Sequence, residues 1–166
     1  HTANHCFSSN TNIAPNATQI QTVANTLTTI WNYEATACNG FTSTTTTQVT
    51  GGAAYLYSSH ITDGMLLRLN GTPPSFAYFA GWIAAPVPAG TTVYAIHHPR
   101  GDAKMVSLGE VRGTTASEIT VGWREGTTEG GSSGSGLFTV GRDGWVVRGG
   151  LWRGDAACSN SGSLAN

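Results

Sequence analysis

The sequence has few charged residues: Asp, Glu, Lys and Arg make up only 10% of its 166 residues, against about a quarter in a typical soluble domain. Eight basic residues stand against nine acidic ones, the net charge is −1, and the basic residues form no cluster. Proteins that bind nucleic acid or anionic membranes hold them through such clusters. The sequence therefore argues against nucleic acid or a membrane surface as the main partner.

Long apolar runs and cysteines are also scarce. No apolar stretch approaches the roughly 20 residues that span a membrane. The three cysteines are Cys6, Cys38 and Cys158, and in an oxidising compartment an odd number implies a free thiol or a partner outside this chain. Low charge and abundant Thr and Ser favour a secreted protein. The length suits one domain or two small ones.

What the chain has instead is a series of short apolar runs at regular spacing. They lie at residues 53–59, 64–70, 76–85, 91–98, 104–111, 118–125, 136–140 and 145–152. Turn sequences such as NGTPP, PVPAG and HPRGD separate them, a pattern that indicates an all-β sandwich or barrel. The sequence also predicts a short helix over 18–27 with Thr18 as its N-cap, a strand over 28–35, and a tight hairpin turn at Asp143–Gly144.

The Gly- and Ser-rich stretch EGGSSGSGLF, at residues 129–138, allows two interpretations. A flexible linker joins two complete domains, but only about thirty residues follow this stretch. Alternatively, small residues let the backbone bend so that successive N–H groups point into one concavity. Those groups could hold a developing oxyanion while a serine hydroxyl attacks a carbonyl. On this stretch alone, linker and nucleophile turn both remain open.

A serine nucleophile needs an adjacent base, and histidine is the usual one. The five histidines are His1, His5, His60, His97 and His98. His5 stands out in TANHC, because small residues precede it and the cysteine after it could fix the local backbone through a disulfide. The base in turn needs a carboxylate, and Asp63 in TDGMLL lies at the start of an apolar strand. His97 and His98 adjoin a strand end and point to opposite faces, so we expect no shared metal.

The stretches TANHC, TDGMLL and GSSGSG, in this order, resemble the histidine, aspartate and serine motifs of the chymotrypsin-like serine proteases. The resemblance is closer to the bacterial lysyl-endopeptidase branch, to which IWNYEATAC, FAGW, YAIHHPRGD, TTEGGSSGSGLF and GGLWRGDAAC are similar. It extends over nearly the whole chain. It implies an all-β fold of two antiparallel six-stranded β-barrels with the active site between them. Residues 1–75 would belong to the N-terminal barrel and residues 76–166 to the C-terminal one.

The resemblance also implies a catalytic triad. His5 would be the general base, Asp63 the carboxylate that orients it, and Ser133 the nucleophile, because Ser133 holds the family's position in G-x-S-G. The flanking serines do not hold that position. The backbone N–H groups of Gly131 and Ser133 would form the oxyanion hole.

The substrate pocket is assigned in the same way. The resemblance implies that Thr127 lies at the base of the specificity pocket and Thr128 on its wall, with Trp152 and Arg153 close by. Arg153 replaces a glycine that pairs with the substrate backbone in the family, so it could narrow the pocket or favour acidic groups. In the lysine-specific branch an acidic residue recognises the substrate cation, and its position falls at or just past Asn166.

The branch also suggests that this chain is a fragment. Its equivalents of Cys6, Cys38 and Cys158 pair with cysteines upstream of the histidine motif, and only four residues precede His5. We expect the first barrel to lack its opening strands, the C-terminal end to stop early, and the isolated chain to fold poorly and to be inactive. Ser132 replaces the Asp that binds the new N-terminus in digestive members, so activation by that route is not expected.

The resulting expectation is a secreted bacterial serine endopeptidase that cleaves polypeptides through an acyl-enzyme, needs no cofactor or metal, and is monomeric at full length. Two alternatives remain: a catalytically inactive trypsin-fold module for binding or adhesion, and an esterase that uses the same triad. The intact triad argues against the first, and no sequence feature separates the second. The tripeptide Arg100-Gly101-Asp102 has the integrin-binding pattern, but within HHPRGD we expect a turn.

Overall fold

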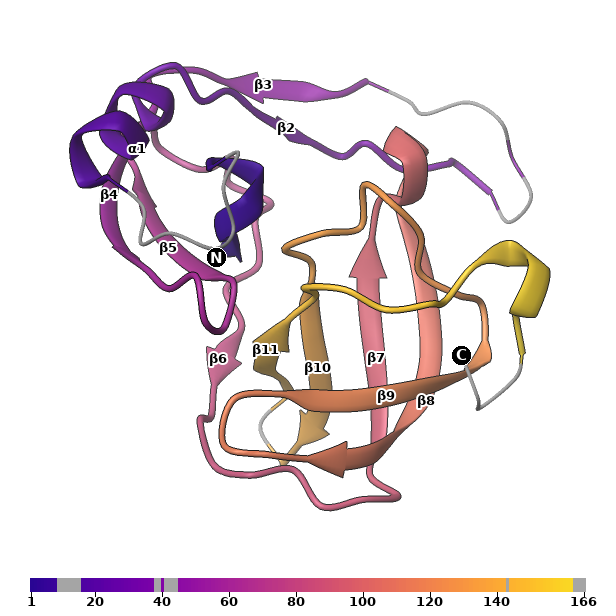
Figure 1. Ribbon diagram of the computed structural model, residues 1–166. Coiled ribbons are helices and arrows are strands. Elements are labelled where there is room, and N and C mark those ends of the chain that lie inside the picture. Colours follow the sequence, from indigo (N-terminus) through magenta and orange to yellow (C-terminus); the bar gives the residue numbers. More distant parts are fainter. Residues whose placement is uncertain (9–15, 38–39, 41–44, 143, 163–166) are drawn as a thin grey trace. The chain divides into compact units, whose positions relative to one another are not determined.

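The computed structural model describes residues 1–8, 16–37, 40, 45–142 and 144–162. Within them the chain forms mainly β-strands, with one α-helix and three short 3₁₀ helices (Figure 1). This confirms the all-β fold class, whereas the number of barrels stays a prediction. The chain divides into two compact units, His1–Tyr78 and Phe79–Asn166, and each is described by itself.

The first unit contains a three-stranded and a two-stranded antiparallel sheet. The larger has the order β1-β5-β4, with β1 at Thr2–Ala3, β5 at Gly64–Leu69 and β4 at Ala53–Ser58, and the smaller pairs β2 (Thr29–Trp31) with β3 (Thr47–Val49). Thr2 lies opposite Met65, and Ala3 lies opposite Gly64. This register brings the residues just after β1 beside the residue just before β5. The histidine and aspartate motifs therefore meet, although they are far apart in the sequence.

Helix α1, Ala17–Ala24, begins earlier than expected and has a different cap. The side chain of Asn16 accepts a hydrogen bond from the backbone N–H of Thr18 at 3.0 Å, so the expectation that Thr18 is the N-cap is wrong. Asn is at least as good a cap as Thr, and from position 16 it reaches the free N–H groups of the first turn. The Gln21 side chain then joins the helix to β4, since it bonds both the Ala53 carbonyl and the Tyr55 N–H.

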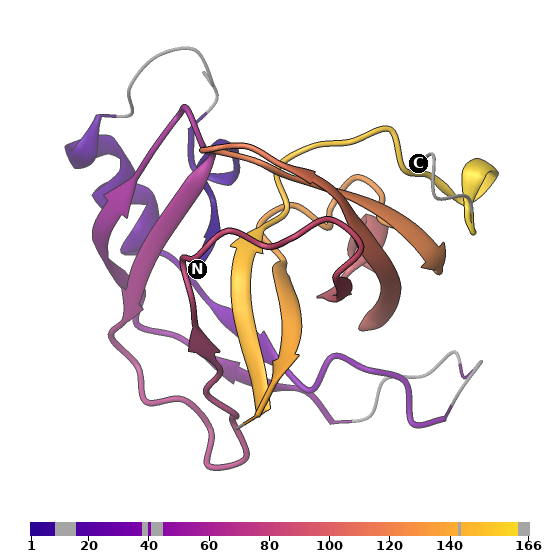
Figure 2. The same cartoon turned by 90° about the horizontal axis from the view of Figure 1, so that it is seen from below.

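The second unit is built on one six-stranded sheet with the order β6-β11-β10-β7-β8-β9. Its strands are β6 (Gly81–Trp82), β7 (Thr92–His97), β8 (Met105–Thr114), β9 (Ile119–Glu125), β10 (Gly136–Gly141) and β11 (Gly144–Gly150). All neighbours are antiparallel except β6 and β11. Figure 2 shows how strongly these strands curve. Val87, Val93 and Val111 form a buried cluster, and the side chains of Ile119, Val121 and Leu137 pack against it.

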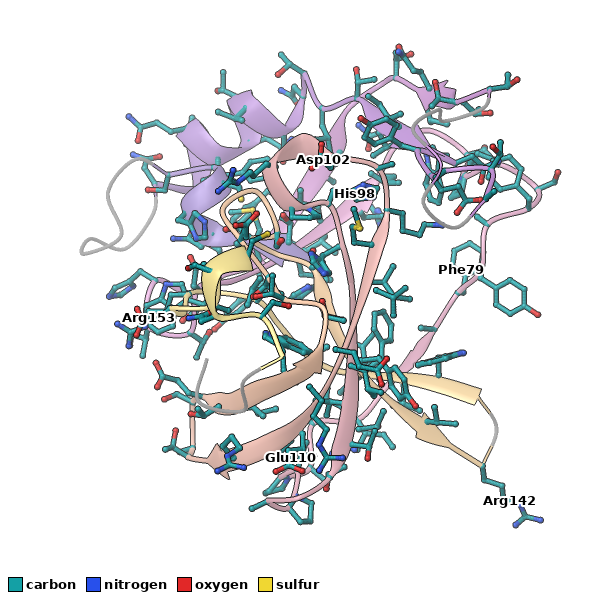
Figure 3. The ribbon with its side chains drawn as sticks, turned by 90° about the vertical axis from the view of Figure 1, so that its right-hand side faces the viewer. Phe79, His98, Asp102, Glu110, Arg142 and Arg153 are labelled. Atoms are coloured by element: carbon teal, nitrogen blue, oxygen red, sulfur yellow. The ribbon has the colours of Figure 1, made fainter. Side chains whose placement is uncertain are left out.

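Most of the expected strands are confirmed, but residues 76–85 are mainly irregular. Only Gly81–Trp82 form a strand there, because only these residues pair with β11. The aromatic side chains before them are exposed, Phe79 to 81%, and Figure 3 shows Phe79 extending away from the ribbon. An apolar run without a pairing partner therefore does not become a strand. In the β10–β11 hairpin Gly141 lies opposite Gly144, and Asp143 falls outside the described residues.

Candidate active site

Asp63 has an unusual backbone that prepares it to receive the histidine motif. It precedes β5 with φ at 54°, in the left-handed region that Asp and Asn adopt more readily than most residues. Its carbonyl accepts the N–H of Asn4 at 2.7 Å. Asn4 begins the 3₁₀ helix η1, Asn4–Cys6, which carries His5 in its middle. The short helix is therefore bound directly to the aspartate.

The Asp63 carboxylate binds His5 with both oxygens. Oδ1 accepts the backbone N–H of His5 at 2.9 Å, and Oδ2 lies 2.5 Å from the ring Nδ1. Asp63 is buried, with a side chain only 2% exposed, whereas the His5 side chain is 29% exposed. An ionised carboxylate can only accept hydrogen bonds, so Nδ1 must carry a proton. In the neutral ring, Nε2 is then the nitrogen that can take a proton from a nucleophile.

The cysteine next to His5 is a free thiol. Cys6 is an exposed residue. Partial desolvation of its thiol by the surrounding protein, and then the negative charge of Asp63, raise the pKa of the thiol above its ordinary value. Cys158 in the second unit is also free, while Cys38 lies outside the described residues. The upstream partners expected for these cysteines stay a prediction.

In the second unit, residues 129–135 form a hydrogen-bonded turn before β10, which we call the serine turn. The N–H of Ser132 bonds the carbonyl of Glu129 at 3.0 Å, and the N–H of Ser135 bonds the carbonyl of Ser132 at 3.1 Å. The segment after β11 fixes the turn from the other side, through Gly134 N–H to Leu151 carbonyl at 2.8 Å and Leu151 N–H to Ser135 carbonyl at 2.9 Å. The stretch is a fixed turn inside one compact unit, so the linker interpretation is wrong.

Two backbone N–H groups of the serine turn are open to a ligand. The carbonyl of Gly130 accepts the N–H of Arg100 at 2.7 Å, and in a trans peptide the following N–H points the opposite way. The N–H of Gly131 therefore points away from Arg100. In the part of the chain that the structure describes, neither this N–H nor that of Ser133 bonds a protein acceptor. Both groups therefore stay available as hydrogen-bond donors.

Gly131 can hardly be any other residue. Its φ is 90°, a conformation that glycine adopts without steric cost. A Cβ at this position would lie 2.9 Å from the backbone nitrogen of Arg100. The close approach of Arg100 and the orientation of the Gly131 N–H therefore depend on the same glycine.

A pocket of about 130 Å³ lies beside Ser133 within the second unit. Thr128, Trp152 and Arg153, three of the residues expected at the substrate pocket, line it together with Ser133 and Glu129. The fourth, Thr127, is not among the lining residues, and its carbonyl accepts a hydrogen bond from the hydroxyl of Ser107 at 3.0 Å.

Opposite charges balance one another around this pocket. The Arg153 guanidinium stacks 4.1 Å from the centre of the Trp152 ring and bonds Glu118 at 3.0 Å, and Figure 3 labels it on the outside of this region. Glu129, on the pocket wall, accepts the Cys158 N–H at 3.2 Å and lies 3.0 Å from Nε of Arg100. The Cys158 hydrogen bond, and then the Arg100 charge, lower the pKa of Glu129 below its ordinary value. This side chain is therefore a carboxylate at neutral pH.

Comparison with known proteins identifies the family. The family described as lysyl endopeptidase, C-terminal domain, matches residues 1–166. The chain belongs to the lysyl endopeptidase family. The lysyl endopeptidase of Pseudomonas aeruginosa is 44% identical to it over 156 residues, which cover 88% of this chain and 34% of that protein. The chain thus spans about a third of the length of this relative. The resemblance inferred from the motifs is confirmed.

In this member of the lysyl endopeptidase family, each of the two units holds part of the expected site. The structure brings His5 and Asp63 together in the first unit. Ser133 and Gly131 share the serine turn of the second unit, with the pocket beside them. Among the described residues, no three His, Cys, Asp or Glu side chains gather as metal ligands would, and no helix has the length and apolarity needed to cross a membrane.

Sequence reasoning gave no role in the site to two residues of the second unit. Glu129 directly precedes the glycines of the serine turn, and its position in TTEGG was the available signal. His97 lies on the buried face of β7 and bonds the serine turn. The alternation of residues 93, 95 and 97 was its signal, since alternate residues of a strand share a face.

Proposed function

We propose that this chain carries the catalytic residues of an extracellular bacterial serine endopeptidase that is monomeric at full length and needs no cofactor. The observation that carries the proposal is the pairing of His5 with Asp63, which leaves Nε2 of the ring as a proton acceptor. Family membership and the two open N–H groups beside Ser133 support it. The activity of the whole protein, its polypeptide substrates and its extracellular location are part of the proposal.

In the proposed mechanism the Ser133 hydroxyl attacks the peptide carbonyl and Nε2 of His5 takes its proton. The Asp63 carboxylate stabilises the imidazolium that forms. The N–H groups of Gly131 and Ser133 hold the oxyanion of the tetrahedral intermediate. His5 then returns the proton to the leaving amine, and water hydrolyses the acyl-enzyme by the same steps. The mechanism requires Nε2 of His5 to reach the hydroxyl of Ser133 when substrate is bound.

We extend the proposal to peptide bonds that follow lysine. The relative is named a lysyl endopeptidase. The carboxylate of Glu129 lies on the pocket wall as a hydrogen-bond acceptor, and its charge is partly neutralised by Arg100. The Arg153 charge is partly neutralised by Glu118, which weakens its repulsion of a basic side chain. A residue at or beyond Asn166 would supply the stronger determinant, as the resemblance implies.

A fluorophosphonate probe tests the proposal on the full-length protein. We expect one equivalent of probe to bind at Ser133, and Ser133→Ala to abolish both labelling and peptide cleavage. Ser135→Ala is the matched control, because Ser135 lies in the same turn without a catalytic role, and it should label normally. A folded full-length protein that takes up no probe would favour the catalytically inactive binding module. A protein that cleaves simple esters but no peptide would favour the esterase. Either result overturns the proposal.

A further inference from the structure

His97 is a fully buried histidine that the mechanism above does not use. It ends β7, where Val93, Ala95 and His97 share the buried face with exposures of 0%, 4% and 1%. A buried polar ring must find hydrogen-bond partners, and this one has two. Its Nδ1 lies 2.8 Å from the hydroxyl of Ser132, and its Nε2 lies 2.9 Å from the hydroxyl of Ser107. Ser132 directly precedes Ser133.

Which group donates in each hydrogen bond of the His97 ring follows from the other bonds of its two serine partners. The Ser107 hydroxyl donates its single hydrogen to the carbonyl of Thr127 at 3.0 Å, so towards His97 it must accept. Nε2 of His97 therefore carries the hydrogen, and Nδ1 of the neutral ring accepts from the hydroxyl of Ser132. The oxygen of Ser132 in turn accepts the N–H of Glu129 at 3.4 Å. The ring is thereby held as the Nε2–H tautomer.

These bonds connect Thr127, just before the serine turn, with Ser132 inside it. The chain of hydrogen bonds starts at the carbonyl of Thr127, passes through Ser107, His97 and Ser132, and ends at the N–H of Glu129. A buried histidine that only needed hydrogen-bond partners for its two ring nitrogens could find them in the core, without a connection to the serine turn. Here the ring lies between strand β8, which carries Ser107, and the residue next to the nucleophile.

The segment that follows His97 adds two further contacts to the same turn. The backbone N–H of Arg100 bonds the carbonyl of Gly130 at 2.7 Å, and the Arg100 side chain pairs with Glu129 at 3.0 Å. His98, between His97 and Arg100 in the sequence, has its Nδ1 3.0 Å from the carbonyl oxygen of Asp102, and Figure 3 labels both residues. His97 and Arg100 thus hold the serine turn at Glu129, Gly130 and Ser132.

We propose that His97 is a positioning residue of the endopeptidase: as the neutral Nε2–H tautomer it anchors Ser132 and so sets Ser133 and the Gly131 N–H in their catalytic orientation. This inference rests on the proposed role of Ser133. It assigns His97, the first residue of the HHP motif, a function in the active site that the triad does not provide. It also explains why a serine can stand at position 132, since its hydroxyl meets a hydrogen-bond acceptor there.

The first test is the tautomer itself. Nitrogen NMR of the full-length protein labelled at histidine should show an unprotonated Nδ1 and a protonated Nε2 for His97 at neutral pH, with the assignment made by loss of the signal in His97→Gln. A protonated Nδ1 would overturn the inference. This measurement does not depend on catalysis, so it stands even if Ser133 is not the nucleophile.

The second test compares two variants that each keep one half of the connection. Asn places its oxygen near the position of Nδ1 and can still accept from Ser132, whereas Gln reaches towards Ser107 and loses that acceptor. We expect His97→Gln to lower kcat by about 100-fold with little change in KM, because the pocket residues Thr128 and Trp152 stay in place. His97→Asn should lose clearly less, and the neighbouring variant His98→Gln should keep normal activity.

A serine variant keeps the test decisive if the histidine variants fold poorly. Ser132→Ala removes only the hydroxyl, and it should slow both peptide cleavage and fluorophosphonate labelling, while Ser135→Ala in the same turn should not. Full activity in folded His97→Gln and Ser132→Ala, with Ser133→Ala inactive, would overturn the positioning role alone. Activity that survives in Ser133→Ala would instead overturn the proposed function.

Discussion

Asp63 and His5 lie 58 residues apart in the sequence and are joined by two hydrogen bonds, one to the backbone and one to the ring of the histidine. The carboxylate therefore fixes both the position of the short helix that carries His5 and the tautomer of its ring. A change that spares the first bond and alters the second can separate these two effects.

Asp63→Asn is such a change. The amide oxygen can still accept the His5 backbone N–H, but the amide NH₂ then faces Nδ1 and favours the tautomer with the hydrogen on Nε2. That nitrogen can no longer accept a proton from the proposed nucleophile, Ser133, so under the proposed mechanism we expect kcat at neutral pH to fall by about 10⁴-fold. Thermal unfolding of the full-length variant should be close to normal. A loss below about tenfold in steady-state peptide cleavage would contradict the proposed role of the pair.

Gly131→Ala should damage the proposed oxyanion hole. The alanine must adopt φ near 90°, and its Cβ would meet the Arg100 nitrogen at 2.9 Å, so the turn must move. Loss of one oxyanion donor costs about 10² to 10³ in kcat. The matched control is Gly113→Ala in β8, where an added Cβ meets no heavy atom within 4 Å. If both variants cleave peptides equally fast, the turn does not provide the anion site.

Acid should destabilise the second unit through His97. Burial, and then the nearby charge of His98, lower the pKa of His97 below its ordinary value, which is about 6.5. The groups around the ring are the hydroxyls of Ser107 and Ser132, with Glu129 on the far side of Ser132. As pH falls below the ordinary value, the unfolded chain binds a proton that the folded ring refuses, so the free energy of unfolding decreases.

Urea unfolding at pH 7 and pH 5 measures this effect. The decrease between the two pH values should be smaller in His97→Gln than in the wild type, because Gln does not titrate. His98→Gln controls for the loss of a nearby histidine and should keep most of the wild-type decrease. Equal decreases in the wild type and His97→Gln would show that the ring is not held neutral.

Asn16→Ala should weaken the first unit at helix α1. The side chain of Asn16 caps the helix by accepting the N–H groups of its first turn, and replacing such a cap by Ala costs about 1 kcal/mol of stability. Thr18→Ala is the matched control, because Thr18 lies in the first turn and donates its backbone N–H rather than capping with its side chain. Denaturant unfolding should place Thr18→Ala near the wild type, and the reverse order would contradict the assignment of the cap.

The sequence predicted the strands that find partners close by and missed relationships that depend on distant pairing. The runs that became β7 to β11 alternate apolar residues and are separated by turn sequences, so local pattern was sufficient. Residues 76–85 are equally apolar, but their structure depends on pairing with β11, which no local pattern reveals. At helix α1 both Asn16 and Thr18 suit a cap, and only the start of the helix decides between them.

The residues of the candidate site also fall into those that the sequence predicted and those that it could not. Motif order was sufficient to pick out His5 and Asp63, and the β1–β5 register explains why they meet. The bond between His97 and Ser132 connects residues that are 35 positions apart, and it exists because the serine turn folds back over the end of β7. The burial of His97 could be read from the alternation along β7, but its partner could not.

The hydrogen bond from Arg100 to the Gly130 carbonyl has a consequence for inhibitors. This bond lies within the protein itself and turns the N–H of the 130–131 peptide away from Arg100, so the orientation of the proposed anion site does not depend on a bound ligand. If the proposal is right, a peptide boronic acid, which becomes a tetrahedral anion on the serine oxygen, needs no rotation of the 130–131 peptide when it binds. Its association should then follow a single exponential with a rate linear in concentration, without the slow tightening that a peptide flip would impose.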